Sequence, residues 1–207
     1  MKHEWRKKEK LYYIPKTKAE LVNIESMKFI QIKGEGNPNE EAFSEVVGAL
    51  YSVAYTIKMM PRNNVEIPRY FEYVVYPLEG LWDLKEEARN KDSFDKSELI
   101  YTIMIRQPEF VTEDIFKDAI KIVKRKKPNK LLDKVEFSTI EDGLCVQMMH
   151  IGHFDEEEKT FKVMKKYCEE NNLALRSKVH REIYISDFRK TEQSKLKTVL
   201  RYMVEKG

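Results

Sequence analysis

The sequence is poor in cysteine and has no long apolar run. Its 207 residues include only Cys145 and Cys168, and neither belongs to a Cys-x-x-Cys pair or a Cys/His cluster. This spacing excludes a disulfide framework and a structural zinc site, and we expect two buried thiols. The longest apolar stretch, Val46–Tyr55, is interrupted by Gly48 and Ser52. It is far shorter than the ~20 residues that span a bilayer, so no membrane segment is expected.

An excess of charge of one sign is also lacking. Thirty-eight Lys and Arg residues against 35 Asp and Glu give a formal net charge of +3. This balance does not favour a general attraction to nucleic acid. The charged N-terminus is not followed by an apolar region of the secretory kind, so the cytoplasm is the expected location. Nothing in the sequence decides the oligomeric state, and a monomer is compatible with it.

Bulky apolar side chains are plentiful, with 11% aromatic residues and nine Met. A chain of this length can bury a core as one large domain or as two similar halves. Alternation and helical spacing predict the elements of the first half. These are a strand over 27–32, a helix from 43 to 57 ended by Pro61, and strands over 70–76 and 100–105.

The second half begins after a helix predicted over 112–127, which Pro128 ends. Two strands, over 135–140 and 144–151, are expected to form a hairpin at Glu141-Asp142-Gly143. The pattern then predicts a helix through Phe161–Cys168 and a strand over 179–186. Residues 196–204 fit both periods poorly, so a last helix and a last strand both stay open.

An internal repeat is the most informative feature. Gly34 precedes Phe43 by the same interval that separates Gly152 from Phe161. The runs 72–77 and 182–187 also share a leading Glu, an aromatic residue and a terminator. We therefore predict an α+β fold with duplicated βαββ-type halves, pseudo-twofold symmetry and a cleft between the halves. One domain over 1–207 would contain half 1 at about 18–106, the inserted helix at about 112–127 and half 2 at about 133–204.

Two runs, Val146–Gly152 and His180–Asp187, resemble the GyrI-like small-molecule-binding family. The run Pro77–Trp82 resembles its stand-alone branch, which has no attached DNA-binding module. The resemblance implies an effector-binding, SHS2-like domain: a curved antiparallel sheet with helices on one side and a ligand cleft on the other. It also implies that Glu182 is the carboxylate that faces a hydrophobic or cationic ligand. Trp82-Asp83 departs from members with two adjacent tryptophans, so catalytic roles do not transfer directly.

The resemblance leaves three functions open. The first is multidrug-type sensing or sequestration of lipophilic, aromatic or cationic small molecules. The second is a cofactor-independent hydrolase that opens cyclopropanoid, DNA-alkylating compounds by adding water. In that case Glu182 or Glu79 would position or deprotonate water, and Tyr184 would stabilise charge on the leaving group. The third is an inhibitor that binds a partner protein. No cofactor is expected for any of them.

The residues themselves support a binding face on the strand over 179–186. Alternation places His180, Glu182 and Tyr184 opposite Ile183 and Ile185, and the isoleucine face is expected to be the packed one. A carboxylate with aromatic walls suits an organic cation, although an ordinary ion pair at a solvated sheet face is the alternative. The full predicted ligand-binding set is Glu182, Tyr184, Trp82, Tyr73, Tyr101, Met104, Met148 and His150.

Several members of this set have a structural alternative. Trp82, with Glu79, is expected in a loop after the strand over 70–76, where it would form either a lid or a core contact. Core packing is also the alternative for Tyr101 and the methionines. His150 and His153 flank a glycine turn without the spacing of metal ligands, so no metal is expected. His150 is then either a donor in the cleft or a satisfied buried histidine.

Overall fold

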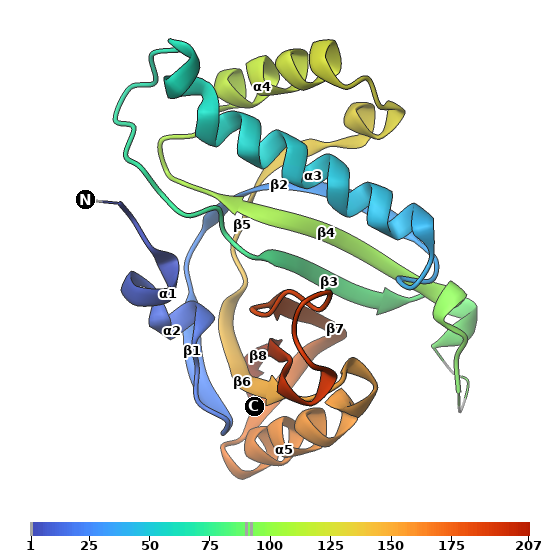
Figure 1. Cartoon of the computed structure of the whole chain (residues 1–207). Coiled ribbons are helices and arrows are strands. Elements are labelled where there is room, and N and C mark those ends of the chain that lie inside the picture. Colours follow the sequence, from blue (N-terminus) through green and yellow to red (C-terminus); the bar gives the residue numbers. More distant parts are fainter. Residues whose placement is uncertain (1, 90, 92) are drawn as a thin grey trace. The chain divides into compact units, whose positions relative to one another are not determined.

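The computed structural model describes residues 2–89, 91 and 93–207, which form two compact units (Figure 1). The first unit takes in the described residues of Met1–Glu4, Met27–Leu78 and Leu84–Ile140. The second comprises Trp5–Ser26, Glu79–Asp83 and Glu141–Gly207. Helices and antiparallel strand pairs occur in both units, so the fold is α+β as predicted.

In the first unit, strand β2 (Met27–Glu35) pairs antiparallel with β4 (Leu99–Gln107) and with β5 (Glu136–Ile140). Helix α3 (Glu41–Met59) contacts β2, β4 and helix α4 (Glu113–Lys126). Its buried residues recur at helical spacing and meet fully buried isoleucines of the sheet, which explains why this segment forms a helix. The helical side of this core is Leu50, Val53 and Ile57, and the strand side is Ile30, Ile103 and Ile105.

The helices predicted over 43–57 and 112–127 are confirmed as α3 and α4. Helix α3 ends at Met59, because Pro61 cannot continue its hydrogen bonding and lies in a short 3-10 turn, η1 (Met60–Asn63). Helix α4 begins after Thr112, whose hydroxyl accepts a hydrogen bond from the Ile115 amide as an N-cap. Among the described residues, no helix is long and apolar enough to cross a membrane.

In the second unit, strand β8 (Lys197–Lys206) lies between β6 (Gly143–Ile151) and β7 (Leu173–Tyr184). Strand β1 (Glu20–Ile24) extends this sheet beside β6, and β3 (Leu78–Leu84) pairs with β7 through Glu79–Trp82. Because β8 is hydrogen-bonded on both sides, residues 196–204 form a strand, which settles the question that the sequence left open.

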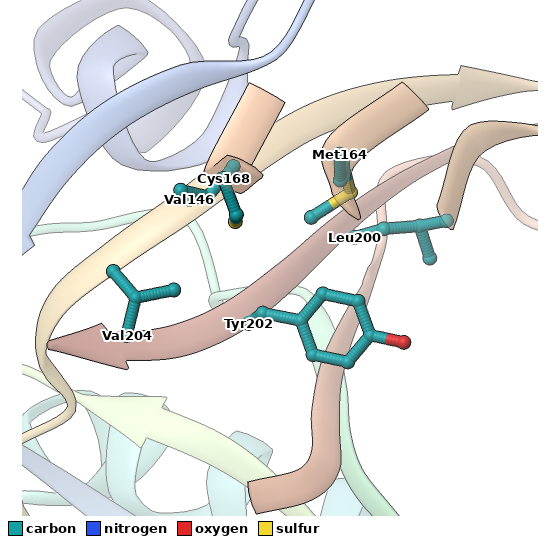
Figure 2. Close-up of a cluster of buried hydrophobic side chains, with 6 residues drawn as sticks. All are labelled: Val146, Met164, Cys168, Leu200, Tyr202 and Val204. Carbon is teal, nitrogen blue, oxygen red and sulfur yellow. The ribbon is translucent and has the colours of Figure 1, made fainter. Parts of the chain in front are cut away.

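Helix α5 (Glu157–Glu170) packs against β6 and β7 of this sheet. Figure 2 shows the apolar cluster that joins them, in which side chains of the helix meet side chains of β6 and β8. The even-numbered residues of β8 therefore point toward α5, since side chains alternate along a strand. The cluster consists of Val146, Met164, Cys168, Leu200, Tyr202 and Val204.

The N-terminal segment of the second unit, with the short helices α1 (Trp5–Lys8) and α2 (Lys10–Tyr13), is tied to the sheet by polar side chains. Arg201 is 2% exposed and donates to the Tyr12 carbonyl at 2.8 Å and to the Gln147 amide oxygen at 2.8 Å. Gln147 donates in turn to the Leu11 carbonyl at 2.7 Å. Buried polar groups on the odd-numbered face of the sheet are thus satisfied by this segment.

The strand predicted over 70–76 is wrong. Within that run of described residues, Tyr73 forms an isolated bridge with His3 and no ladder follows. Tyr73 and Tyr76 are instead buried by side-chain packing, with the Tyr73 and Phe110 rings 5.9 Å apart. The strand begins directly after Pro77, as β3. Aromatic content favours a strand only where a neighbouring strand is available, and here side-chain packing decided the structure.

The internal repeat is still present, but its second strand in the first half is β3. The order of strand, turn, helix and strand occurs as β2, α3 and β3, and again as β6, α5 and β7. The segment matching β7 is therefore β3 and not the run 72–77. Glu79 and Trp82 are strand residues, so their predicted placement in a loop is also wrong. The single-domain boundaries and the cleft between the halves stay predictions.

Candidate functional site

Glu182 lies on the face of β7 that helix α5 covers. In the strand register, Glu182 is opposite Gly80 on β3 and Leu200 on β8. Opposite residues of antiparallel strands project to the same face, and Leu200 belongs to the cluster under α5. Gly80 places no side chain beside Glu182, as is common where a ligand or another backbone comes close.

The isoleucine face is packed, as predicted, but the face of Glu182 is covered as well. Ile183 is 1% exposed and Glu182 is 9% exposed. The solvated sheet face considered for Glu182 is therefore wrong, because the first turn of α5 lies against it. A carboxylate removed from water must find donors or lose its charge.

Glu182 finds its donors in neighbouring aromatic side chains. The Tyr184 hydroxyl donates to Glu182 Oε2 at 2.8 Å, and the Trp82 indole Nε1 donates to the Tyr184 oxygen at 2.8 Å. His180 Nε2 lies 3.0 Å from Glu182 Oε1. Three residues that the sequence assigned to a ligand site, Trp82, Glu182 and Tyr184, are thus brought into one hydrogen-bonded chain. Burial and the charge of Glu182 raise the pKa of Tyr184 well above its ordinary value, so the phenol stays a donor.

Glu157 belongs to this cluster and was missed by the sequence reasoning. It lies in the first turn of α5, is 7% exposed, and shares a side-chain hydrogen bond with Glu182. Burial and, next, the charge of Glu182 raise the pKa of Glu157 to about 10. Its Oε1 is buried and accepts no hydrogen bond from an amide, hydroxyl or cationic group among the described residues. Glu157 is therefore a neutral carboxylic acid at pH 7, held beside a second carboxyl group.

Aromatic rings surround the two acids. The Phe161 ring meets the His180 ring edge-on at a centroid distance of 4.7 Å and lies 5.1 Å from the Tyr202 ring. Phe154 packs edge-on against Tyr184 at 5.9 Å. His180, Tyr184, Phe154 and Phe161 are only partly buried, so they form the outer boundary of the cluster. We call the set Trp82, Phe154, Glu157, Phe161, His180, Glu182 and Tyr184 the acid cluster.

Glu79 lies elsewhere, in a cluster on the opposite face of the sheet. Its register partner is Ile183, and its carboxylate accepts from Arg181 Nη1 at 3.0 Å. Arg181 also donates through Nε and Nη2 to Asp142 at 2.7 and 2.8 Å. Burial acts to raise the pKa of Asp142, but Arg181 more than offsets it and holds the pKa below its ordinary value. Glu79 is thus engaged in an ion pair and does not reach Glu182.

His150 and Met148 are engaged in the packing of the second unit. His150 is 4% exposed, with Nδ1 2.8 Å from the Thr160 hydroxyl and Nε2 3.0 Å from the His153 carbonyl. This is the satisfied buried histidine that the sequence left as an alternative. Met148 packs against the apolar cluster under α5. In the described part of the chain, no group of three or more His, Cys, Asp or Glu side chains could hold a metal ion.

The remaining predicted ligand residues belong to the first unit. Tyr73 is buried among aromatic rings, and burial raises the pKa of its phenol. Tyr101 on β4 meets the Phe43 ring edge-on at 5.1 Å, and Met104 is 0% exposed. All three contribute to the core of that unit. Their part in ligand binding stays a prediction.

A surface hollow of about 330 Å³ is present in the second unit, but it is not the acid cluster. Its lining includes Arg6, Lys16 and Lys197 beside Met149 and Ile185, and excludes Glu182. Its rim is basic, so it does not offer the negative charge on which the sequence argument depends. The chemistry of the acid cluster therefore carries more weight than the shape of this hollow.

Fold and site together define the class of protein: an α+β domain that holds a buried pair of acids among aromatic rings. The chain belongs to the GyrI-like small molecule binding domain family, whose model matches residues 17–204. The residues of the acid cluster all fall inside this match.

Solved structures give the same fold. An uncharacterized conserved protein from Listeria innocua is 37% identical, with a TM-score of 0.92 over 99% of this chain and 100% of that one. A hydrolase from Listeria innocua is 36% identical, with a TM-score of 0.89 over 99% and 100%. The EcmrR C-terminal domain, 13% identical with a TM-score of 0.55 over 92% and 98%, shows the fold alone. A comparison with curated proteins found no match.

Proposed function

We propose that the acid cluster binds lipophilic, aromatic or cationic small molecules, and that the protein senses or sequesters them. The observation that carries this proposal is that Glu182 is buried with phenol and imidazole partners. The neighbouring cation, Arg181, is taken up by Asp142 and Glu79 on the other face. An ordinary ion pair with Arg181 therefore does not account for Glu182.

The chemistry of the cluster suits an organic cation better than a neutral ligand. A carboxylate in a site of low polarity attracts a cation more strongly than it does in water. Rings such as Trp82 and Phe161 add attraction between a cation and the face of an aromatic ring. Membership of a small-molecule-binding family supports this assignment.

Fluorescence titration with N-methylacridinium, a planar organic cation, tests the proposal. Replacing Glu182 by Gln keeps the shape of the side chain and removes its charge, so we expect a loss of ~1–3 kcal/mol of binding free energy. The matched control is Glu158→Gln, at an exposed glutamate whose partner is Lys162. Equal binding by wild type and Glu182→Gln, or no binding by either, would contradict the proposal.

Hydrolysis of a strained ring is the second candidate. Two of the similar structures, 36% and 37% identical to this chain, are described as hydrolases from Listeria innocua. Here Glu182 would position or deprotonate a water molecule while the Tyr184 hydroxyl stabilises charge on the leaving group. The water oxygen would bond to one ring carbon, the strained bond would break, and a proton would end on the carbon released. Glu79 is a weaker candidate for this role because Arg181 holds it.

Mass spectrometry separates the two candidates. Incubation with a cyclopropane-bearing alkylating compound should give a product heavier by one water if the protein is a hydrolase, whereas binding alone leaves the mass unchanged. Tyr184→Phe should slow product formation more than it weakens binding, since the phenol acts on the developing charge. If no compound in a broad set of cyclopropanes is converted, the hydrolase function is wrong and only the binding function stands. The partner-protein alternative stays a prediction from the resemblance.

A further inference from the structure

Glu157 and Glu182 are two carboxyl groups that share a hydrogen bond inside the protein. Two carboxylates cannot accept from each other, so a hydrogen bond between them requires a proton on one of the pair. Both residues are buried, with Glu157 7% and Glu182 9% exposed, which adds a desolvation cost to a second negative charge. The ligand-free pair therefore holds one proton and one negative charge.

The hydrogen-bond partners decide which residue holds the proton. Glu182 Oε2 accepts from the Tyr184 hydroxyl and Oε1 lies 3.0 Å from His180 Nε2, so each of its oxygens already has a partner. Glu157 Oε1, by contrast, is buried and accepts from no donor group among the described residues. Asp155, two residues before Glu157 in the preceding 3-10 turn, adds negative charge and also favours the neutral form of Glu157. Of the other groups around the pair, Trp82 is not titratable, and Tyr184 and His180 face Glu182.

We infer that Glu157 keeps its proton in the ligand-free protein and releases it when an organic cation binds beside Glu182, so that cation binding is exchanged for a proton. This inference rests on the proposed function. The ligand supplies the positive charge that the proton had supplied, and the proton leaves to solvent.

The size of the effect follows from Coulomb's law. A unit positive charge about 4 Å from a carboxyl group lowers its pKa by about three at an effective dielectric constant of about 20. For Glu157, this brings the pKa from about 10 to near neutrality. Proton release should then be nearly complete at about pH 8.5 and nearly absent at about pH 6. Affinity for a permanent cation should rise up to tenfold per pH unit within that interval.

A neutral ligand of the same shape should behave differently, because it brings no charge to replace the proton. Acridine is such a ligand: it has the ring system of N-methylacridinium and is uncharged at about pH 8.5. Its affinity should be independent of pH from about pH 7 to about pH 8.5, where it carries no charge, and its binding should release no proton. Glu157 would thereby determine how strongly the site prefers cations, and would tie that preference to pH.

Calorimetric titration in two buffers of different ionisation enthalpy measures the protons released. We expect about one proton per N-methylacridinium bound to wild type at about pH 8.5, and none for Glu157→Gln. The control Glu158→Gln, one residue along in the same helix turn, should release the same proton as wild type. Wild type that binds the cation without releasing a proton would overturn the inference while the proposed binding function stands.

A measurement without ligand keeps the inference testable if Glu157→Gln folds poorly or no cation binds. The infrared band of a protonated carboxyl group should be present in wild type at about pH 8, and should be lost in Glu157→Gln but not in Glu158→Gln. Absence of this band in folded wild type would overturn the inference directly. Presence of the band with no cation binding by wild type would mean that the binding function, and with it the exchange, is wrong.

Discussion

Arg181 and Glu182 are consecutive residues of β7, both are buried, and their surroundings differ in kind. Arg181 meets two carboxylates, Asp142 and Glu79, so opposite charges meet and each hydrogen bond is charge-assisted. Glu182 meets a second acid, Glu157, and the neutral donor Tyr184. In the first cluster every charge contacts an opposite charge, whereas in the second the negative charge contacts only a protonated acid, a phenol and an imidazole.

The two clusters separate buried charges that hold the fold together from those that are available for chemistry. A charge paired with opposite charges has nothing further to bind, whereas a like-charged pair is stabilised by anything positive that enters. The two clusters should therefore respond differently to mutation and to pH.

The largest effect is expected from Arg181→Met. Asp142 and Glu79 would be left as buried carboxylates without their cation, which should lower the free energy of unfolding by about 3–5 kcal/mol. Urea denaturation measures it, with Arg189→Met as the control at an exposed ion pair with Asp187. Adding Asp142→Leu and Glu79→Met to the variant should recover most of the loss, because all three charges are then gone. No recovery would show that the cluster acts through its shape and not through its charge.

A smaller effect, and one that depends on pH, is expected for Glu157→Gln. Between its ordinary pKa of 4.5 and the folded value of about 10, the folded protein holds a proton that the unfolded chain has lost. Stability contributed by Glu157 therefore falls as pH rises, by up to about 1.4 kcal/mol per pH unit. The variant lacks this slope, so its stability relative to wild type should improve from pH 6 to pH 9. Parallel curves for the two proteins would refute the raised pKa.

The stability that the Arg181 cluster contributes should depend on pH in the opposite direction. The pKa of Asp142 lies below its ordinary value of 3.8 in the folded protein. The stability that Asp142 contributes is present above that value and is lost as pH falls below it. Low pH therefore weakens the Arg181 cluster, whereas high pH weakens the acid cluster.

The smallest effect is expected for Tyr184→Phe. The change removes the hydroxyl that donates to Glu182 and accepts from Trp82, and should cost about 1–2 kcal/mol of unfolding free energy. Tyr55→Phe, at a tyrosine that is 51% exposed, is the control. Thermal unfolding followed by circular dichroism measures the difference. A loss as large as that of Arg181→Met would mean that the two clusters do not differ in kind.

Much of the fold could be predicted from the sequence, because most elements carry a clear period. Helices α3 and α4 and strands β2, β4 and β6 follow from spacing and from Pro61 and Pro128. The run 70–76 misled because aromatic and β-branched residues favour a strand without showing whether a partner strand exists. That information lies in long-range packing, here with Phe110.

The acid cluster was predicted in part. Glu182, Tyr184 and Trp82 were named from alternation and resemblance, and they do lie together. The ion pairs of Arg181 join residues 39 and 102 positions apart, which no local pattern shows. Glu157 was overlooked among the acidic residues that open α5. Its spacing of seven residues from Met164 places it on the buried face of that helix, and this was a usable signal.

The hydrogen bonds from the sheet to the N-terminal segment matter for the design of shortened proteins. Arg201 donates to the Tyr12 carbonyl, and Gln147 donates to the Leu11 carbonyl. The family match begins at residue 17. A shortened version trimmed to that boundary would remove the Tyr12 carbonyl that accepts from the buried Arg201 and the Leu11 carbonyl that accepts from Gln147. Such a version should be poorly soluble, and its loss of binding would say nothing about Glu182. Affinity tags and fusions are better placed after the exposed Gly207.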